Sequence, residues 1–491
     1  MASRMENGST RKPTPAHNPG EEYDRFDDTA EEAYGVERQG TFGRPILTSR
    51  ARNNDGQRRR EDSGAYDAPA EYGNLDETVA DPVGHDPNGV RAGKAPDLEE
   101  MRSGREARAG PDDVEMQDDH ATNGTAETAE KPTGHVSKMA TELYTLSYLV
   151  FFSIFGTLAR LGLQALTTYP DAPVSFGVLW ANVGGSLVMG FLAEDRKLFR
   201  HEWGTATYDA QIRNARRQRD VDAVDLAAAK KAHLATKKTI PLYIGLATGF
   251  CGSFTSFSSF IRDVFLAMTN DLPGAGDVAP SPRNGGYSFM AMLAVIITTV
   301  GLSLCGLFVG AHLAVALEPV TPSVPFSVGR KVLDRVAVLL GWGCWLGAVL
   351  LSIWPPRDAW RGQAVFSLVF APLGCLVRFY VSMCLNSRIP SFPLGTFTVN
   401  VVGVAVLGMC WDLGHAELGG VVGCQVLQGV EDGFCGCLTT VSTWVAELAA
   451  LRRRHAYTYG TASVVTGFAI MVVIMGGMRW SDGFGPLVCI H

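Results

Sequence analysis

Hydroxyl and aromatic side chains lie close together in one glycine-rich stretch, residues 249–260, inside an apolar region of the chain. The same pattern returns at residues 433–444. Hydroxyl groups can bind an ion, and the edge of an aromatic ring carries partial positive charge that can face an anion. Glycine allows a helix to break and free its carbonyl oxygens. A polar, breakable segment at membrane depth therefore predicts an ion site built from two copies of one motif.

The composition of the chain changes at about residue 140. Residues 1–142 are polar and charged, cannot bury enough apolar surface to fold, and are predicted to be a disordered cytoplasmic tail without a signal peptide. Apolar runs long enough to cross a bilayer follow, separated by short loops. The expected divisions are a first repeat at 143–317 with a basic cytoplasmic insert at 195–239, a linker with one helix at 318–362, a second repeat at 363–480, and a short C-terminal tail at 481–491.

The apolar runs predict an all-α integral membrane protein with nine spans. These are 143–166, 174–194, 240–268, 287–317, 331–354, 363–386, 392–411, 420–450 and 458–478. The insert is rich in Lys and Arg, has a helical pattern at 221–235, and marks the cytoplasmic side. Nine spans then predict a cytoplasmic N-terminus and an extracellular C-terminus.

An internal repeat links the two halves. A glycine precedes Arg160 by four residues, as another does Arg378, and the same separation leads from these arginines to Asn182 and Asn400. Each half has four predicted spans, so the extra span at 331–354 turns the second copy upside down. The result is an inverted repeat with a pseudo-two-fold axis in the membrane plane. GxxxG spacing before each central stretch, at 245–249 and 429–433, favours close helix packing.

These repeated motifs resemble the Fluc/CrcB fluoride channel family, and the fused double-length form looks like its eukaryotic members, the fluoride exporters (FEX). The resemblance covers about residues 143–480 and leaves out the tail and the insert. It implies a structural sodium ion at the helix breaks, held by backbone carbonyls. By motif position these belong to Gly252, Thr255, Gly436 and Thr439. The alternative is that both threonines hydrogen-bond only within their own helices.

The resemblance also implies an anion pathway of amide, aromatic and hydroxyl groups. The residues at the corresponding positions are Asn182, Asn400, Phe257, Phe260, Trp444, Ser256, Ser258, Thr440 and Ser442. Each type also has a packing interpretation, because an Asn can join two helices, a Phe can fill a core, and a hydroxyl can bond to the preceding turn. The second half carries Val441 and Trp444 where the first has phenylalanines. We therefore expect one competent pore and one degraded pore.

Charged residues inside the spans need partners. The resemblance implies a structural and electrostatic role for Arg160 and Arg378, while snorkelling to the membrane surface is the alternative. Asp263 and Glu447, at matching positions, are possible partners. Two further acidic residues, 431 and 432, are either a vestibule rim or helix N-terminal charges, and we favour the latter.

Further predictions concern hydroxyls and thiols. The polar residues of the fourth spans that could line the path are Tyr287, Thr298, Ser303, Tyr459, Ser463 and Thr466. The ten cysteines lie mostly in apolar runs without metal-like or secreted-domain spacing, and are interpreted as packing residues.

The predicted function is a plasma-membrane channel that exports cytosolic fluoride passively and so confers fluoride resistance. A negative interior drives the anion outward, and no nucleotide-binding motif indicates a pump. The alternative is a proton-coupled fluoride antiporter, which would need a central buried carboxylate. A membrane enzyme is disfavoured because catalytic motifs are missing from the sequence. Expected partners are fluoride and lipid, with no nucleic acid, and the chain is expected to work as a monomer with an internal pseudo-dimer.

Overall fold

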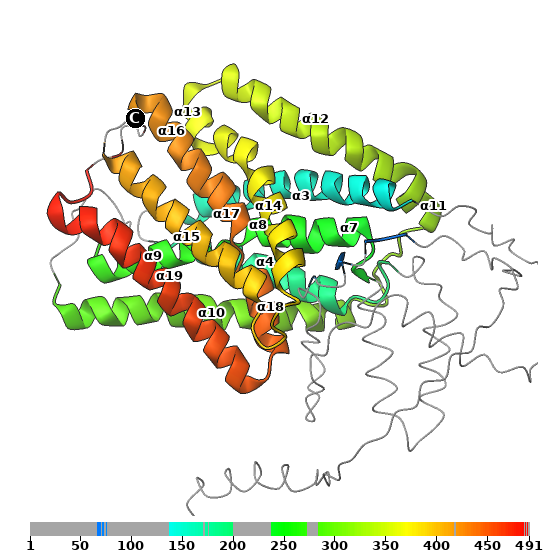
Figure 1. Cartoon of the computed structure of the whole chain (residues 1–491), viewed down its shortest axis with the longest axis horizontal. Helices are drawn as coiled ribbons and strands as arrows, with labels where there is room; N and C mark the ends of the chain where they lie inside the picture. Colours follow the sequence, from blue (N-terminus) through cyan, green and yellow to red (C-terminus); the bar gives the residue numbers. More distant parts are fainter. Residues whose placement is uncertain are drawn as a thin grey trace, which may run out of the picture. The chain divides into compact units, whose positions relative to one another are not determined.

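The computed structural model describes residues 66–69, 71, 72, 75, 137–169, 172–174, 176–199, 237–272, 283–416, 419–485, 487 and 489. Helices make up all of the regular elements in this part of the chain (Figure 1), which confirms the all-α class there. In chain order, with η for π-helical segments, they are α3 (Lys138–Thr167), α4 (Val178–Glu194), α7 (Pro241–Ile244), η4 (Gly245–Cys251), α8 (Gly252–Phe254), α9 (Phe257–Thr269), α10 (Gly285–Ala316), α11 (Phe326–Val328), η5 (Gly329–Leu333), α12 (Asp334–Ile353), α13 (Asp358–Trp360), η6 (Arg361–Val365), α14 (Phe366–Leu385), α15 (Leu394–His415), α16 (Gly420–Gly429), η7 (Val430–Cys435), α17 (Gly436–Leu438), α18 (Ser442–Ala450) and α19 (Arg453–Ser481).

Seven helices of the described part are long and apolar enough to cross a membrane. They are Lys138–Thr167, Pro241–Thr269, Gly285–Ala316, Gly329–Ile353, Phe366–Leu385, Leu394–His415 and Arg453–Ser481. The apolar helix α4 is shorter, and the predicted span 420–450 consists of α16, η7, α17 and α18. Large apolar side chains are exposed on several of these helices, for example Leu339 at 74% and Val473 at 77%. Such surfaces suit a lipid environment, so the chain is a multi-pass membrane protein.

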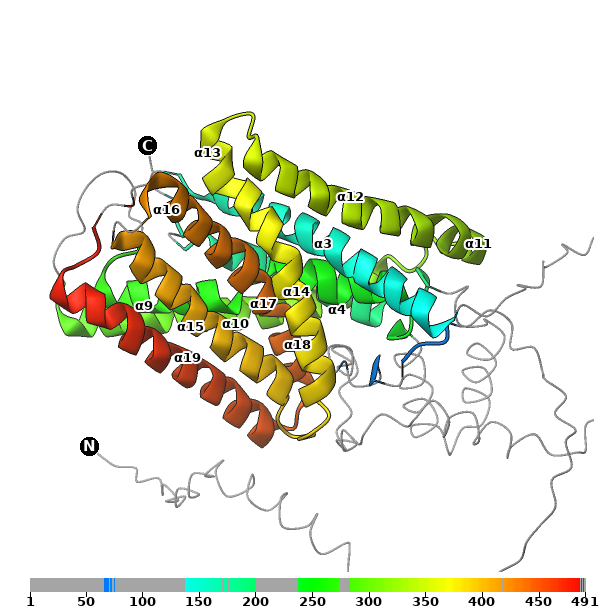
Figure 2. The same ribbon diagram turned by 45° about the horizontal axis from the view of Figure 1, so that its top comes forward.

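The helices pack as neighbours that are often distant in sequence. Linking helix α12 lies along α3, and α15 lies between α16 and α19 (Figure 2). Helices α4 and α10 approach closely, because a Cβ atom on Gly306 would lie 2.8 Å from the carbonyl oxygen of Val183. This packing brings both glycine-rich stretches to the centre of the bundle.

The two predicted GxxxG contacts are confirmed. In the first half, a Cβ atom on Gly245 would lie 2.6 Å from Cβ of Tyr148 in α3, and one on Gly249 would lie 3.0 Å from Cβ of Phe152. In the second half, Gly429 and Gly433 make the equivalent approach to the start of α14. The small residues thus bring each third helix against the first helix of its own half.

A buried lysine lies near the end of the basic insert. Lys237 Nζ donates to the carbonyl oxygens of Leu192 (3.0 Å) and Ala193 (3.1 Å), and also to that of Asp195. A cation at the C-terminal end of a helix stabilises its last carbonyls, here those of α4. Burial lowers the pKa of Lys237 to about 7. Most of the basic insert, including its predicted helix at 221–235, lies outside the described residues.

Part of the N-terminal tail is ordered, contrary to the prediction for residues 1–142. Residues 137–142 begin α3, and four side chains between positions 66 and 75 are buried. These are Tyr66, Ala68, Tyr72 and Leu75. The composition argument was wrong here because a few apolar side chains of a polar segment are buried against the helices of the bundle. The rest of the predicted disordered tail lies outside the described residues.

The chain after α19, here called the C-terminal strap, is held to α16 by a disulfide that the sequence analysis missed. Cys424 in α16 is bonded to Cys489, and the Phe484 ring packs against Trp411 and His415 of α15. The interpretation of the cysteines as packing residues is therefore wrong for this pair. Their wide separation in sequence gave no spacing signal, and only the fold brings them together.

Candidate functional site

Both third helices are interrupted at matching positions. In the first half α8 ends at Phe254, Thr255 is extended (φ −92°, ψ 153°), and α9 begins at Phe257. In the second half α17 ends at Leu438 and Thr439 is extended in the same way (φ −96°, ψ 155°). The helices in the glycine-rich and hydroxyl-rich stretches are therefore interrupted as the sequence predicted. The interruption leaves backbone polar groups in the centre of the bundle without their helical hydrogen bonds.

Each threonine at a break caps the broken helix of the other half. Thr439 Oγ1 accepts hydrogen bonds from the backbone N–H groups of Phe257 and Ser258, both at 3.1 Å. Thr255 Oγ1 accepts from the N–H groups of Val441 and Ser442, also both at 3.1 Å. Side-chain oxygens commonly cap helix N-termini, but here the cap comes from the partner helix. The two interrupted helices are thus reciprocally bonded.

The threonine hydroxyls also bond within their own helices, so the alternative interpretation describes only part of their hydrogen bonds. Thr255 Oγ1 donates to Cys251 O (3.1 Å), and Thr439 Oγ1 donates to Cys435 O (2.9 Å). A hydroxyl has one hydrogen to donate and two lone pairs to accept. The local bond uses the hydrogen, and the lone pairs remain for the other half.

The two asparagines form hydrogen bonds with the backbone at the same breaks. Asn182 Oδ1 accepts from Ser256 N at 2.8 Å, and Asn400 Oδ1 accepts from Thr440 N at 2.9 Å. Each Nδ2 lies at a longer distance, 3.4 Å and 3.3 Å, from the carbonyl oxygen of the same residue. Both asparagines are fully buried. Their amide oxygens accept hydrogen bonds from the backbone, while the side-chain Nδ2 groups can still donate to another group.

Eight carbonyl oxygens lose their helical donors at the breaks. In an unbroken helix, each carbonyl would accept from the N–H four residues further along. Ser256 N and Thr440 N instead donate to the asparagines, while Ser259 N donates to Ser256 Oγ (3.2 Å) and Thr443 N to Thr440 Oγ1 (3.4 Å). The carbonyls that lose these donors are those of Gly252, Thr255, Gly436 and Thr439, which are the four that the sequence analysis singled out for a cation. The threonine caps likewise take the donors of four more carbonyls, those of Ser253, Phe254, Cys437 and Leu438.

The two buried arginines bridge the halves through carbonyl groups. Arg160 donates to Ser253 O at 3.0 Å and also to Asp432 O. Arg378 donates to Cys437 O and to Thr248 O, both at 2.8 Å. Each guanidinium therefore bonds to the third helix of its own half and to that of the other half. Because both side chains are buried, the snorkelling interpretation is wrong.

Glycine is required where these guanidinium groups pass. A Cβ atom on Gly252 would overlap the guanidinium of Arg378, and one on Gly436 would overlap that of Arg160. The glycine of each break therefore makes room for the arginine of the opposite half.

The predicted carboxylate partners of these arginines are engaged elsewhere. Asp263 pairs with Arg262 at 3.1 Å. Glu447 accepts from Thr396 Oγ1 and from the Tyr459 hydroxyl, both at 2.6 Å. The prediction was wrong because matching sequence positions did not indicate depth. Both carboxylates lie beyond the break, whereas the arginines bond at the break itself.

The aromatic side chains of both halves meet in the core. The rings of Phe257 and Phe260 are edge to face at 5.6 Å, and those of Phe257 and Trp444 are edge to face at 5.2 Å. All three are buried, as is Val441. Within the described part of the chain, Trp444 Nε1 has no hydrogen-bond partner. A buried indole N–H without a partner is a donor available to an anion.

The fourth helices contribute fewer of the predicted groups than expected. Tyr287 is 66% exposed, and Thr298 Oγ1 donates to its own helix at Ala294 O (2.6 Å). Thr299 is buried instead, one turn before Ser303, and neither hydroxyl has a partner among the described residues. The four-residue spacing of Thr299 and Ser303 on one helix face was the signal that could have found Thr299.

The predicted polar groups of the other fourth helix are placed differently. Tyr459 and Ser463 are buried and hydrogen-bonded, whereas Thr466 is half-buried.

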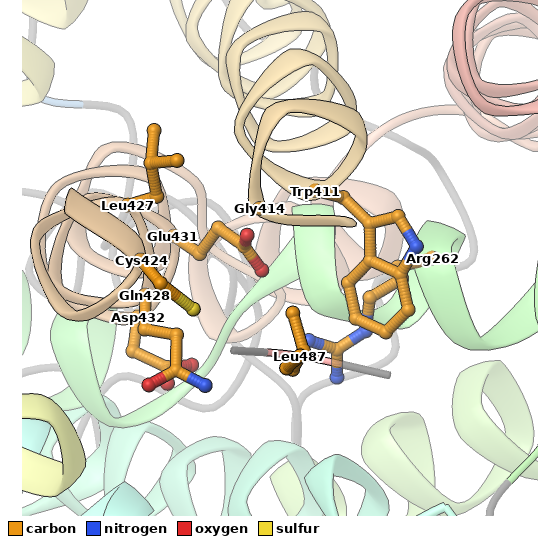
Figure 3. A pocket seen from close by; sticks show the side chains of 9 residues that line it. All are labelled: Arg262, Trp411, Gly414, Cys424, Leu427, Gln428, Glu431, Asp432 and Leu487. Carbon is orange, nitrogen blue, oxygen red and sulfur yellow. The ribbon is translucent and has the colours of Figure 1, made fainter. Parts of the chain in front are cut away.

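A pocket of about 110 Å³ lies beside the second interrupted helix (Figure 3). Its lining residues are Arg262, Trp411, Gly414, Cys424, Leu427, Gln428, Glu431, Asp432 and Leu487. Glu431 and Asp432 lie in η7, which continues directly from α16, so the favoured interpretation as helix N-terminal charges is wrong. They line a pocket, with the Arg262 guanidinium 5.5 Å from the centre of the Trp411 ring.

Fold and site together define a multi-pass helical membrane protein whose centre is made by two reciprocally bonded, interrupted helices. A family model described as "CrcB-like protein, Camphor Resistance (CrcB)" matches residues 147–311 and 365–477. The chain belongs to this family.

Several curated proteins are similar to the chain. "Fluoride export protein 1" of Neurospora crassa is 55% identical over 479 residues, which cover 92% of this chain and 90% of that protein. The Candida albicans protein of the same name is 36% identical over 68% of this chain and 80% of its own length. "Fluoride-specific ion channel FluC 1" of Nocardia farcinica is 40% identical over 117 residues, or 24% of this chain and 78% of that protein. No solved structure matches the chain.

Proposed function

We propose that this protein is a fluoride channel that exports fluoride passively across the plasma membrane and is not an enzyme. The central observation is the pair of reciprocally bonded, interrupted helices, because such breaks supply hydroxyl, amide and carbonyl groups inside a membrane protein. The names of the relatives, fluoride export proteins and fluoride-specific ion channels, support the same ion and direction. Two buried guanidinium charges beside the breaks favour an anion nearby.

The halves are proposed to form an inverted repeat in nine spans, with the N-terminus in the cytoplasm. The reciprocity of the threonine and arginine contacts supports a pseudo-two-fold axis between them. A disulfide to Cys489 supports an extracellular C-terminal strap, because such bonds persist outside the cytosol. A tag after residue 491 should bind antibody on intact cells, whereas labelling only after permeabilisation would contradict this topology.

Two helix groups combine the residues proposed for the anion pathway. Helix α9 packs against α15 and α19, so Phe257 and Phe260 share a group with Asn400. Helix α18 packs against α4 and α10, so Trp444 shares a group with Asn182. The polar lining of the two groups would come from Ser256, Ser258, Thr440 and Ser442. Each group combines the aromatic helix of one half with the asparagine helix of the other.

Only the group with two phenylalanines is proposed to conduct. Val441 has no ring edge to present to an anion, whereas Phe257 and Phe260 present two. Asn400→Asp should therefore reduce fluoride efflux much more than Asn182→Asp does. Equal losses from the two variants would contradict a single conducting path.

A structural sodium ion is proposed at the breaks. The carbonyl oxygens of Gly252, Thr255, Gly436 and Thr439 fit this role, because their helical donors are diverted and hard cations prefer oxygen ligands. When bound, the ion would supply positive charge that holds both interrupted helices together. Replacing sodium with a large organic cation during purification should lower the melting temperature, and an unchanged melting temperature would oppose the site.

The function is tested by fluoride efflux from liposomes that contain the purified protein. A potassium diffusion potential that is negative inside should accelerate efflux, and one of opposite sign should slow it, because a channel carries net charge. Protein-free liposomes are the control. Efflux that ignores the potential and follows a pH gradient would instead favour the proton-coupled antiporter, for which the buried Glu431 at the pocket offers a carboxylate.

A further inference from the structure

A short segment of the N-terminal tail, of which residues 66–69, 71, 72 and 75 are described, is bound to the helical bundle (blue in Figure 1). Tyr72 is 2% exposed and Leu75 is 3% exposed, although the sequence around them is polar. Residues 76–136 separate the segment from the first span. A segment that is joined to the bundle only through a long connection must be held by its own contacts.

The first contact is a buried hydrogen bond to the linking helix. The Tyr66 hydroxyl donates to Asp334 Oδ2 at 2.8 Å, and the Tyr148 hydroxyl of α3 donates to Asp334 Oδ1 at 3.2 Å. Asp334 is the first residue of α12 and is almost fully buried. The Arg330 guanidinium lies over the Tyr66 ring, 3.3 Å from its centre. Tyr66 therefore completes a polar cluster that also holds α3 and α12.

The second contact is apolar and involves both halves. Tyr72 meets the Phe379 ring of α14 edge to face at 5.7 Å. Ala68, Tyr72 and Leu75 belong to one buried apolar cluster, whose other members come from α3, α7, α14 and α17. These are Leu149, Ile244, Ala371, Cys375, Phe379, Met383 and Cys437. Burial raises the pKa of Tyr72 to about 12, so its hydroxyl stays neutral at cellular pH.

Opposite charges also favour the place of this segment beside the start of α12. The segment carries Asp67 and the exposed Glu71, whereas the chain beside α12 carries Arg330, Lys331 and Arg335. Acidic groups on the segment and basic groups at the start of the linking helix attract one another. The tyrosine hydroxyls, which are neutral donors, meet the one acidic residue of that region, Asp334.

We propose that the segment around Tyr66 and Tyr72 forms an intramolecular latch, which packs against α3, α14 and the start of α12. Because these helices come from both halves and the linker, the bound latch fixes the three relative to one another. The connection of residues 76–136 keeps the segment at high local concentration, so it can detach and rebind without unfolding a span. Release of the latch would loosen the linking helix from both halves.

The test uses the full-length chain with a specific protease site inserted between residues 101 and 130. After cleavage in detergent, the N-terminal fragment should co-elute with the membrane part on a sizing column, although no covalent bond remains between them. Separation of the wild-type fragment directly after cleavage would overturn the latch.

Variants then locate the contact. The pair Tyr66→Ala and Tyr72→Ala should release the fragment while the membrane part keeps its elution volume. Tyr66→Phe keeps the ring and loses only the bond to Asp334, so we expect about tenfold faster release, as for one buried bond to a charged group. Tyr457→Ala, at an exposed position of α19, which adds no residue to the apolar cluster around the segment, is the matched control and should retain the fragment. Retention by the double variant would place the binding elsewhere and refute the proposal.

This readout is independent of the ion that the protein conducts. Loss of the latch with normal fluoride efflux, or the reverse, would separate the two proposals.

Discussion

The two interrupted helices share one framework and differ in their aromatic residues. Thr255 and Thr439 make equivalent hydrogen bonds to opposite halves, and Arg160 and Arg378 bond to equivalent carbonyls. After the breaks the two halves differ in sequence, because Val441 lies at the position that corresponds to Phe257 of the first half. The contacts that the halves share are those that satisfy backbone polar groups.

The reason for this difference is energetic. A backbone N–H or C=O left without a partner inside a membrane protein costs on the order of 1–3 kcal/mol, so a substitution that removes its partner is strongly unfavourable. At an aromatic position after the break, by contrast, any apolar side chain that fills the space leaves no backbone group without a partner. The framework therefore tolerates little change in either half, whereas the aromatic positions can become different.

The largest expected effect is the loss of a central arginine. Arg160→Leu and Arg378→Leu should each destabilise the protein by on the order of 3 kcal/mol, because each leaves two buried carbonyls without a donor. The yield of monodisperse protein and its melting temperature measure this loss. Arg453→Leu, at an exposed position, is the control and should behave as wild type. If only one of the central arginines proved necessary, the shared framework would not be symmetric.

The next effect concerns the caps that cross between halves. Thr255→Val and Thr439→Val should each cost about 2 kcal/mol, because each removes the acceptor of two backbone N–H groups while keeping the side-chain shape. Thermal unfolding in detergent measures it. Thr255→Ser and Thr439→Ser retain the hydroxyl and should lie close to wild type. Unequal losses from the two valine variants would indicate that one half dominates the framework.

The third prediction concerns the region where the halves differ. Phe257→Ala should slow fluoride efflux by at least about tenfold, which corresponds to about 1.4 kcal/mol of barrier, whereas Val441→Ala should change it by less than about twofold. Efflux from liposomes at equal protein content measures both, and melting temperatures show whether packing is intact. Comparable slowing by both variants would mean that positions 257 and 441 have not diverged in function.

The smallest expected effect is that of the disulfide, which belongs to the second half. Cys424→Ser or Cys489→Ser should lower stability by no more than about 1 kcal/mol, within the range known for disulfides, because the helices inside the loop that the bond closes are already held by packing against the bundle. Melting temperatures with and without a reductant measure it, and reductant should leave the serine variants unchanged. A collapse of folding in these variants would show that the strap supports the core.

Local patterns predicted much of this arrangement. Apolar runs indicated the helices, and the repeated glycine and hydroxyl stretches indicated the breaks, because length and composition alone decide whether a segment suits a bilayer. The close glycine contacts of both third helices followed from GxxxG spacing. The hydrogen-bond acceptors of Arg160 and Arg378 could not be predicted from the sequence, because they are backbone carbonyl groups. Every residue has such a group, so none is marked by its type.

The sequence by itself determined the membrane class, the repeated motifs and the positions of the breaks, since these depend on neighbouring residues. Only the tertiary structure decided that each threonine caps the opposite helix, that Cys424 meets Cys489, and that Tyr66 reaches Asp334. Such pairings join residues far apart in the chain. Which of them form depends on how the helices pack, and no local pattern specifies that.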